Sequence, residues 1–109
     1  MILNTRAERV ADVLRDAHDY MLVHGRCRGK VVNRAGEVCL VGAIGRAGLS
    51  HNPTDVQSAM ATMVLLGFGT FFNDDPDTTD DMVFDSFAVT EKRLRDGEIE
   101  PPSMAQVVT

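Results

Sequence analysis

Four side chains in the sequence are of the types that bind zinc, namely His24, Cys27, Cys39 and His51. Only two residues separate His24 from Cys27, which is a plausible spacing for a close pair of zinc ligands. The other spacings match no zinc motif, and residue type without spacing is weak evidence. We therefore expect no metal site and no cofactor. His24 would end a helix, His51 would lie in a loop, and both thiols would be reduced.

Nucleophilic catalysis finds little support in the sequence. Ser50 and His51 are adjacent, but no Gly-x-Ser-x-Gly context surrounds them. Glycines 42, 45 and 48 are three residues apart, so they form neither a P-loop nor a dinucleotide-binding motif. This spacing is typical of a helix that packs closely against its neighbours. We expect no enzyme, and the alternative is a small-ligand or enzymatic pocket near Cys39, His51 and Asn73.

The charged residues are unevenly distributed along a chain with a net charge of −5. The first 48 residues contain eight Lys and Arg against five Asp and Glu, whereas the remaining residues contain three against eleven. The basic excess lies in residues 26–34 and comes from Arg26, Arg28, Lys30 and Arg34. The acidic excess includes six aspartates between positions 74 and 85. Two oppositely charged segments of this kind can steer association with a partner.

Part of the acidic run has a structural explanation, because aspartates at a helix start satisfy free N–H groups and favour the helix dipole. The remainder, above all Asp77, Asp80 and Asp81, is available to a partner. An alternative is that this run imitates a phosphate backbone and blocks a basic groove on another protein. The basic segment is short and belongs to an acidic chain, so we expect no binding to nucleic acid.

Four amphipathic or apolar stretches predict helices. The first covers residues 6–24, with Thr5 as N-cap and Glu8 completing a capping box. The second covers residues 39–47. The third starts near Asn52 or Thr54 and ends near residue 66, and the last covers residues 80–95 after a cap at Thr78 or Thr79.

The stretches between these helices predict a hairpin and loops. Val31, Val32 and a turn signal at residues 33–36 predict a short β-hairpin over residues 26–38. Residues 68–72 would form an apolar connector and residues 73–79 a loop. The fold class is therefore mainly α, a four-helix single domain with a short β-hairpin between helices 1 and 2. The predicted core consists of Leu14, Tyr20, Leu40, Ile44, Met60, Val64, Phe68, Phe71, Phe84 and Phe87.

The length of 109 residues suits one domain, which we place at residues 1–97, with residues 98–109 as a loosely attached tail. No apolar run approaches the roughly 20 residues that span a bilayer. Charges near the start of the chain do not fit a signal peptide. We expect a cytoplasmic protein that makes no contact with a membrane.

Two stretches together resemble a family of small domains of unknown function from actinobacteria and their phages. One is Cys-Leu-Val-Gly-Ala-Ile at residues 39–44, and the other is Phe-Asn-Asp-Asp-Pro-Asp-Thr-Thr at residues 72–79. Members of the family read approximately Cys-Leu-x-Gly-Ala-Ile and Trp-Asn-Asp-x-Pro-x-x-Thr, and the resemblance covers about residues 5–96. It implies a bacterial or phage accessory protein. A structural motif would comprise Cys39, Gly42, Phe72, Asn73, Asp74 and Thr79.

We predict from these observations a non-enzymatic module that binds a protein partner, which would be a host protein if the source is a phage. Arg26, Arg28, Lys30 and Arg34 would contact the partner from the basic side, and the aspartates from the acidic side. The same charge distribution would also allow pairing with a second copy of the chain.

Overall fold

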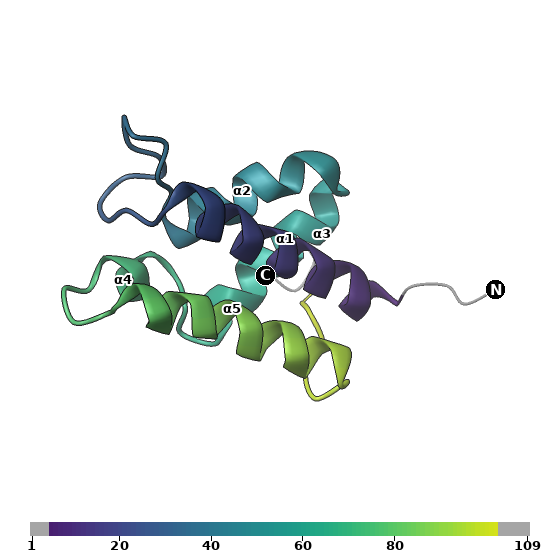
Figure 1. The fold of residues 1–109 in the computed structure, drawn as a ribbon. Helices are drawn as coiled ribbons and strands as arrows, with labels where there is room; N and C mark the ends of the chain where they lie inside the picture. The colour runs from purple at the N-terminus through teal and green to yellow at the C-terminus, as the bar shows by residue number, and fades with distance from the viewer. Residues whose placement is uncertain (1–4, 103–109) are drawn as a thin grey trace.

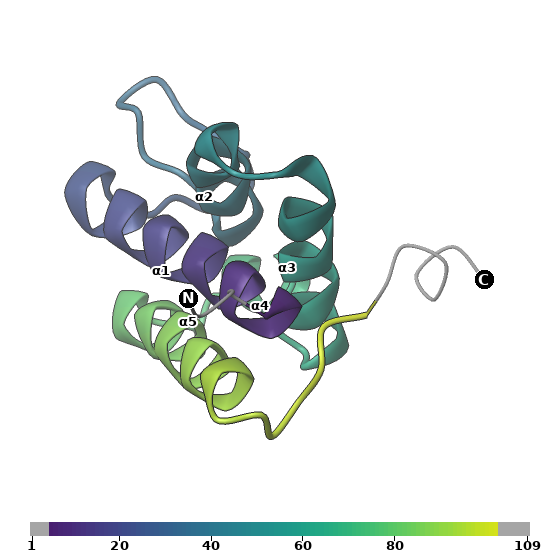
Figure 2. The same ribbon diagram turned by 90° about the vertical axis from the view of Figure 1, so that its right-hand side faces the viewer.

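The computed structural model describes residues 5–102, and these residues form helices grouped around one central helix (Figure 1). The helices are α1 (Arg6–His24), α2 (Leu40–Ala47), α3 (Pro53–Leu65), α4 (Thr70–Asp74) and α5 (Asp80–Arg95), and a short 3-10 turn, Gly48–Ser50, follows α2. Figure 2 shows that α1 lies between α2 and α5 and also faces α3. The prediction of a mainly helical fold is thus confirmed.

Local capping sets where the long helices begin. Thr5, Asn52 and Thr79 each accept a hydrogen bond through a side-chain oxygen from a backbone N–H in the first turn of α1, α3 and α5. At α2 the sulfur of Cys39 takes this role and accepts from the Gly42 N–H at 3.3 Å. The starts of α1, α3 and α5 agree with the predicted ones, because a cap and its partner are only two or three residues apart. Helix α2 begins at Leu40, one residue after the predicted start, because Cys39 is its cap.

The core lies between α1 and the helices that surround it. Leu14, Leu40, Ile44 and Phe87 are buried as predicted, and Tyr20, Met60, Phe68 and Phe84 are partly buried against them. The prediction is wrong for Val64 and Phe71, which are 57% and 95% exposed. Phe71 and Phe72 are consecutive on α4, so their side chains point in directions about 100° apart and cannot both face the core.

The predicted β-hairpin over residues 26–38 is wrong. Within residues 5–102 there is no β-strand, and this segment is a loop with two isolated bridges, Arg26 to Val38 and Val32 to Val38. Side chains take up the backbone groups that a strand ladder would use. The Asn33 carboxamide accepts from two N–H groups of the turn, and Asn73 and Asp74 bond to the loop from outside. A loop whose backbone is satisfied in this way does not need a partner strand.

The stretch predicted as a connector and loop contains a helix. Residues Thr70–Asp74 form α4, whose backbone hydrogen bonds include Asn73 N–H to Gly69 O at 3.0 Å. One turn of helix is too short to have a hydrophobic period, so its sequence carries no helical signal.

The segment after α5 returns to the start of α1. Ile99 is partly buried against the core and Pro101 is buried. The Arg6 guanidinium donates to the carbonyl oxygens of Pro101 and Pro102, and Ser58 Oγ donates to Pro102 O at 3.0 Å. The remainder of the expected tail, residues 103–109, lies outside the described residues. Across residues 5–102, no helix has the length and apolar character needed to cross a membrane.

Candidate functional site

The buried side chain of Asn73 joins three segments of the chain. Its residue is 0% exposed, although it lies on a short helix next to exposed residues. Asn73 Oδ1 accepts from the Leu40 N–H at the start of α2 (3.1 Å) and from Arg26 Nε (3.4 Å). Asn73 Nδ2 donates to Cys27 O and to Asp74 Oδ1, both at 3.0 Å. Every polar atom of the carboxamide is therefore satisfied, which is what a fully buried amide requires.

Arg26 is the second buried polar residue of this cluster, with only 2% of its side chain exposed. Its guanidinium donates to Asn73 O at 2.6 Å and to Thr78 O at 3.1 Å, and it contacts Asp80 Oδ1 at 2.6 Å. The planar, fixed fork of an arginine suits such convergent acceptors. Arg26 thus belongs to the protein interior and does not present its charge to a partner. No feature of the sequence distinguishes it from the neighbouring exposed basic residues.

Asp74 completes a cluster that we call the polar hub (Arg26, Asn73 and Asp74). Asp74 Oδ1 accepts from the Gly29 N–H at 3.0 Å and from the Asn73 amide. These hydrogen bonds hold the pKa of the Asp74 carboxyl below its ordinary value of 3.8, and the bond from the Gly29 N–H has the larger effect. The hub fastens the loop between α1 and α2 to α4 and to the start of α5.

A close backbone contact lies beside the hub. The Cys39 N–H donates to Val31 O at 3.1 Å. An added Cβ at Gly42 would meet the same Val31 oxygen at 2.1 Å, so only glycine allows the loop to lie this close to α2. Cys39, Gly42, Asn73, Asp74 and Thr79 therefore occupy structural positions. Phe72 is partly buried and contacts Phe68 edge to face, with ring centroids 5.1 Å apart.

The residues that could bind zinc do not assemble into a site. Cys39 caps the start of α2, whereas His51 follows the end of that helix and pairs with Asp16, with Nε2 and Oδ2 2.6 Å apart. His24 stacks on Tyr20. Among the residues that the structure describes, no three His, Cys, Asp or Glu side chains are placed to hold a metal ion. Cys39, His51 and Asn73 therefore do not converge on one pocket.

The Cys27 thiol is buried close to the hub. Its sulfur lies 3.3 Å from the carbonyl oxygens of Lys30 and Glu37. Burial raises the pKa of this thiol above its ordinary value of 9.0. A thiol with a raised pKa is seldom ionised at neutral pH and is a poor nucleophile.

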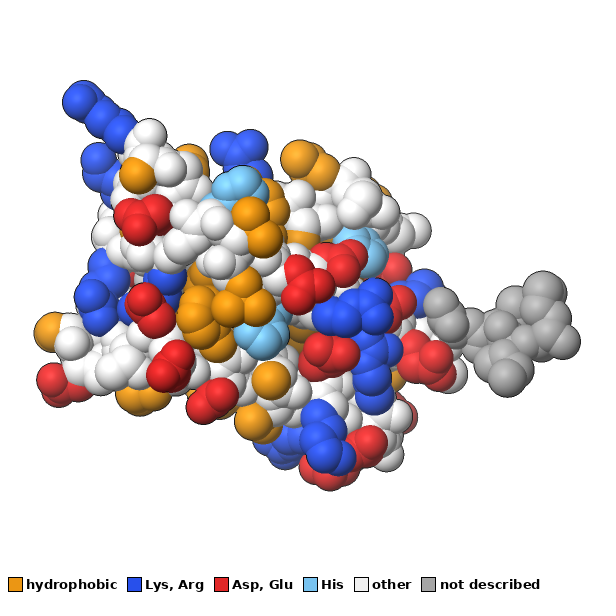
Figure 3. All heavy atoms as spheres, in the orientation of Figure 1, with side chains coloured by type: hydrophobic (Ala, Val, Ile, Leu, Met, Phe, Trp, Pro, Cys, Tyr) orange, Lys and Arg blue, Asp and Glu red, His pale blue; other side chains and the backbone are white. Residues whose placement is uncertain are grey.

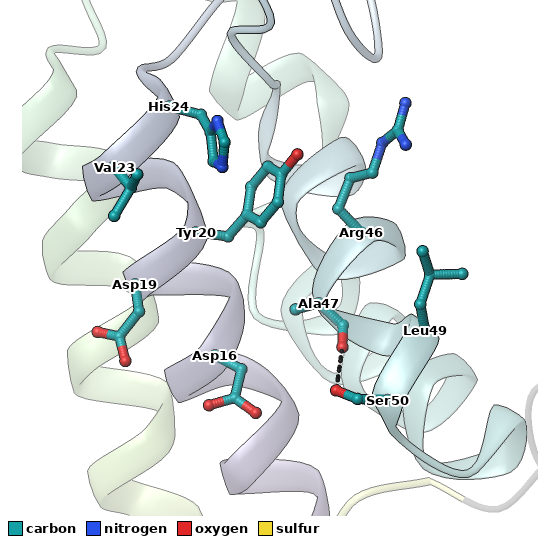
Figure 4. Close-up of a pocket in the computed structure, with 9 residues that line it drawn as sticks. All are labelled: Asp16, Asp19, Tyr20, Val23, His24, Arg46, Ala47, Leu49 and Ser50. Atoms are coloured by element: carbon teal, nitrogen blue, oxygen red, sulfur yellow. Dashed lines mark hydrogen bonds between the residues drawn. The ribbon is translucent and has the colours of Figure 1, made fainter.

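An open groove runs between α1 and the end of α2, with a volume of about 570 Å³ (Figure 4). Its lining is mixed: Asp16 and Asp19 on one side, the stacked rings of Tyr20 and His24, and Leu49 on the other. Figure 4 shows the Arg46 guanidinium extending away from the carboxylates. The groove contains no nucleophile paired with a base, because Ser50 bonds to Ala47 O.

The two charged segments meet at one end of the molecule. Figure 3 shows basic side chains over the loop between α1 and α2 and acidic side chains along the α4–α5 edge. Arg26 contacts Asp80, and Arg28 donates to Thr78 O at 2.6 Å. The segments therefore bind each other in part. Lys30, Arg34, Asp77 and Asp81 remain exposed.

A contiguous apolar surface borders α4, and no pattern in the sequence predicts it. Phe71 is 95% exposed, and Met82 and Val89 are about half exposed. Two shallow hollows of about 420 and 260 Å³ lie here, and the side chain of Phe72 lines both. We call this the α4 surface: Val64, Phe68, Phe71, Phe72, Met82 and Val89. The only available signal was the Phe71-Phe72 pair on one short segment.

The family comparison agrees with the coarse part of the resemblance. Residues 5–93 match the model of the family described as "Family of unknown function (DUF6197)". Neither a curated protein nor a solved structure gives a significant match to the chain. The match begins at the cap of α1 and ends inside α5, so it includes the polar hub and the α4 surface. The chain therefore belongs to this family of unknown function.

Proposed function

We propose that this protein is a non-enzymatic module that binds a protein partner through the α4 surface. The observation that carries the proposal is the exposure of Phe71, 95%, within a continuous apolar area. A phenylalanine held in water costs solvation free energy that burial at an interface would recover. Large apolar patches on soluble domains commonly mark protein contacts.

The surface also has the shape of a binding face. Gly67 and Gly69 line the larger hollow together with the exposed Phe71, and neither glycine has a side chain to occupy it. Gly67 has a φ of +86°, a conformation that glycine adopts without strain, and this turn ends α3. Projecting aromatic residues next to a hollow are typical of residues that dominate binding energy.

The proposal includes a role as an accessory protein of a bacterium or its phage, working in the cytoplasm. The motifs at residues 39–44 and 72–79, which resemble those of actinobacterial and phage domains, support the first part. The free, buried thiols of Cys27 and Cys39 fit a reducing compartment and support the second.

Site-directed photocrosslinking in the source cell tests this function. A photoreactive phenylalanine analogue replaces Phe71 in one sample and Leu49, which is 83% exposed in the groove of Figure 4, in another. We expect a discrete crosslinked protein from position 71 and none from position 49. The absence of a discrete product from position 71, or the same product from both positions, would contradict the proposal.

A further inference from the structure

We infer that the α4 surface takes a basic amphipathic helix, a segment whose apolar face is flanked by Lys and Arg. This inference rests on the proposed function and specifies the chemistry of the partner. It combines the apolar hollows with the acidic side chains around them.

The two apolar hollows can accept apolar side chains from one face of a partner helix. The larger hollow lies between Val64 and Phe71, the smaller between Phe68 and Val89, and Phe72 separates the two. A helix that lies in a groove inserts residues spaced by three, four or seven positions into successive hollows of this kind. No Lys or Arg lines either hollow.

Acidic side chains border the smaller hollow. Asp85 lines the smaller hollow, and Asp81 lies one turn earlier on α5. Asp77 follows α4. Within residues 5–102, neither Asp81 nor Asp85 forms an ion pair, whereas Asp80, at the start of the same helix, pairs with Arg26. Acidic groups left without a cation beside an apolar surface favour a partner that brings cations to them.

The same charges argue against other occupants. In a twofold pair of this chain, Asp81 and Asp85 of both copies would border the same interface, and the chain already has a net charge of −5. Like charges brought together at an interface oppose binding. Phosphates of nucleic acid or of anionic lipids would meet the same repulsion. A cationic helix is the occupant that satisfies both the hollows and the aspartates.

Binding of three fluorescent peptides to the intact chain tests the inference by anisotropy. The first peptide is an amphipathic helix of Leu and Lys. The second has the same Leu positions with Glu in place of Lys, and the third is a scrambled form of the first. We expect the Leu–Lys helix to bind at least about tenfold more tightly than either control, because each control lacks one of the two complementary features.

Variants of the chain show whether the peptide occupies the α4 surface. We expect Phe71→Ser to weaken binding of the Leu–Lys helix by about tenfold or more, because an exposed aromatic anchor is removed. The pair Asp81→Asn and Asp85→Asn should weaken binding and reduce its dependence on salt. The matched controls are Leu49→Ser and Asp19→Asn, which lie in the groove of Figure 4 and should leave the affinity unchanged.

Several results would overturn the inference. These are equal affinity for the Lys and Glu helices, unchanged binding by Phe71→Ser, and tighter binding of duplex DNA than of the Leu–Lys helix. Light scattering that finds a wild-type dimer and a Phe71→Ser monomer would identify a second copy as the occupant. A crosslink from position 71 without peptide binding would refute the cationic helix and leave the proposed function standing. Binding of the Leu–Lys helix without any crosslink from position 71 would refute the proposed function and leave the preference of the α4 surface for a cationic helix standing.

Discussion

Asn73 and Phe71 are two residues apart on α4, yet their burial is the reverse of what their polarity suggests. The polar Asn73 is 0% exposed, and the apolar Phe71 is 95% exposed. Asn73 tolerates burial because its carboxamide makes four hydrogen bonds, to Leu40, Arg26, Cys27 and Asp74. Phe71 has no comparable compensation. The hydrogen bonds of Asn73 therefore set the position of α4, and in that position the side chain of Phe71 is exposed to solvent.

The largest effect should come from removing the buried amide. Asn73→Ala leaves the Leu40 N–H and the Cys27 carbonyl without their partner, and we expect it to lower the free energy of unfolding by about 3–5 kcal/mol. Urea unfolding followed by circular dichroism measures this loss. Asn52→Ala is the matched control, because it removes an exposed N-cap and should cost about 1 kcal/mol. Equal losses in the two variants would show that the hub does not hold α4.

A slightly smaller effect is expected where the loop contacts α2. Gly42→Ala forces a Cβ toward Val31 O, so we expect a loss of about 2–3 kcal/mol in the free energy of unfolding. Gly45→Ala, on the same helix, meets nothing within 4 Å and should instead stabilise by about 0.5–1 kcal/mol. Thermal unfolding of both variants distinguishes the close contact from a general effect of glycine replacement. A Gly42→Ala protein as stable as wild type would contradict the contact.

The contribution of Asp74, the acidic residue of the polar hub, should appear in the pH dependence of the unfolding free energy. The folded-state pKa of Asp74 lies below its ordinary value, because the Gly29 N–H and the Asn73 amide donate to the carboxylate. A lowered pKa means that the ionised group stabilises the folded state above the unfolded-state pKa of about 4. This stabilisation is lost as the pH falls through the lower folded-state pKa.

Asp74→Asn should therefore flatten the decline of the unfolding free energy below pH 4. Denaturant titrations between pH 2 and pH 7 compare the two proteins. Asp77→Asn is the matched control, because within residues 5–102 the Asp77 carboxylate, unlike that of Asp74, accepts no hydrogen bond. A decline as steep in Asp74→Asn as in wild type would show that Asp74 is not coupled to folding.

The smallest effect on stability is expected at the exposed aromatic residue. Phe71→Ser should change the free energy of unfolding by no more than about 0.5 kcal/mol, since the side chain contacts mostly water. Its neighbour Phe72 packs on Phe68, so Phe72→Ser should cost about 2 kcal/mol or more. Differential scanning calorimetry of the pair measures both values. A large loss of unfolding free energy in Phe71→Ser would show that Phe71 stabilises the fold.

The starts of the long helices were predictable because each is determined by residues close in sequence. Thr5, Asn52 with Pro53, and Thr79 bond within two or three residues, and each helix begins beside its cap. The hairpin prediction failed for the opposite reason. Asn73 and Asp74 form hydrogen bonds with loop residues that are 45 or 46 positions earlier in the chain. The pattern of residues within the loop cannot predict such distant bonds.

The candidate site residues likewise include some whose role was predictable from the sequence and some whose role was not. The predicted structural motif comprises Cys39, Gly42, Phe72, Asn73, Asp74 and Thr79, and each of these residues makes a hydrogen bond or a packing contact within the fold. Arg26 was predicted to face a partner, but its side chain is internal. The α4 surface is not predicted, because the apolar pattern of the third helix places Val64 in the core and the apolar connector places Phe71 there, whereas both are exposed.

The sequence by itself determined the helical class, the starts of the long helices and the segregation of charge into two segments, since these depend on composition and on bonds between near neighbours. Only the tertiary structure decided that the Arg26 side chain is buried against the carbonyls of Asn73 and Thr78 and that Phe71 is exposed. The physical reason is that a side chain is buried or exposed according to the groups that surround it. For α4 those groups come from the loop before α2 and from α2 itself, 33 to 47 residues earlier in the chain.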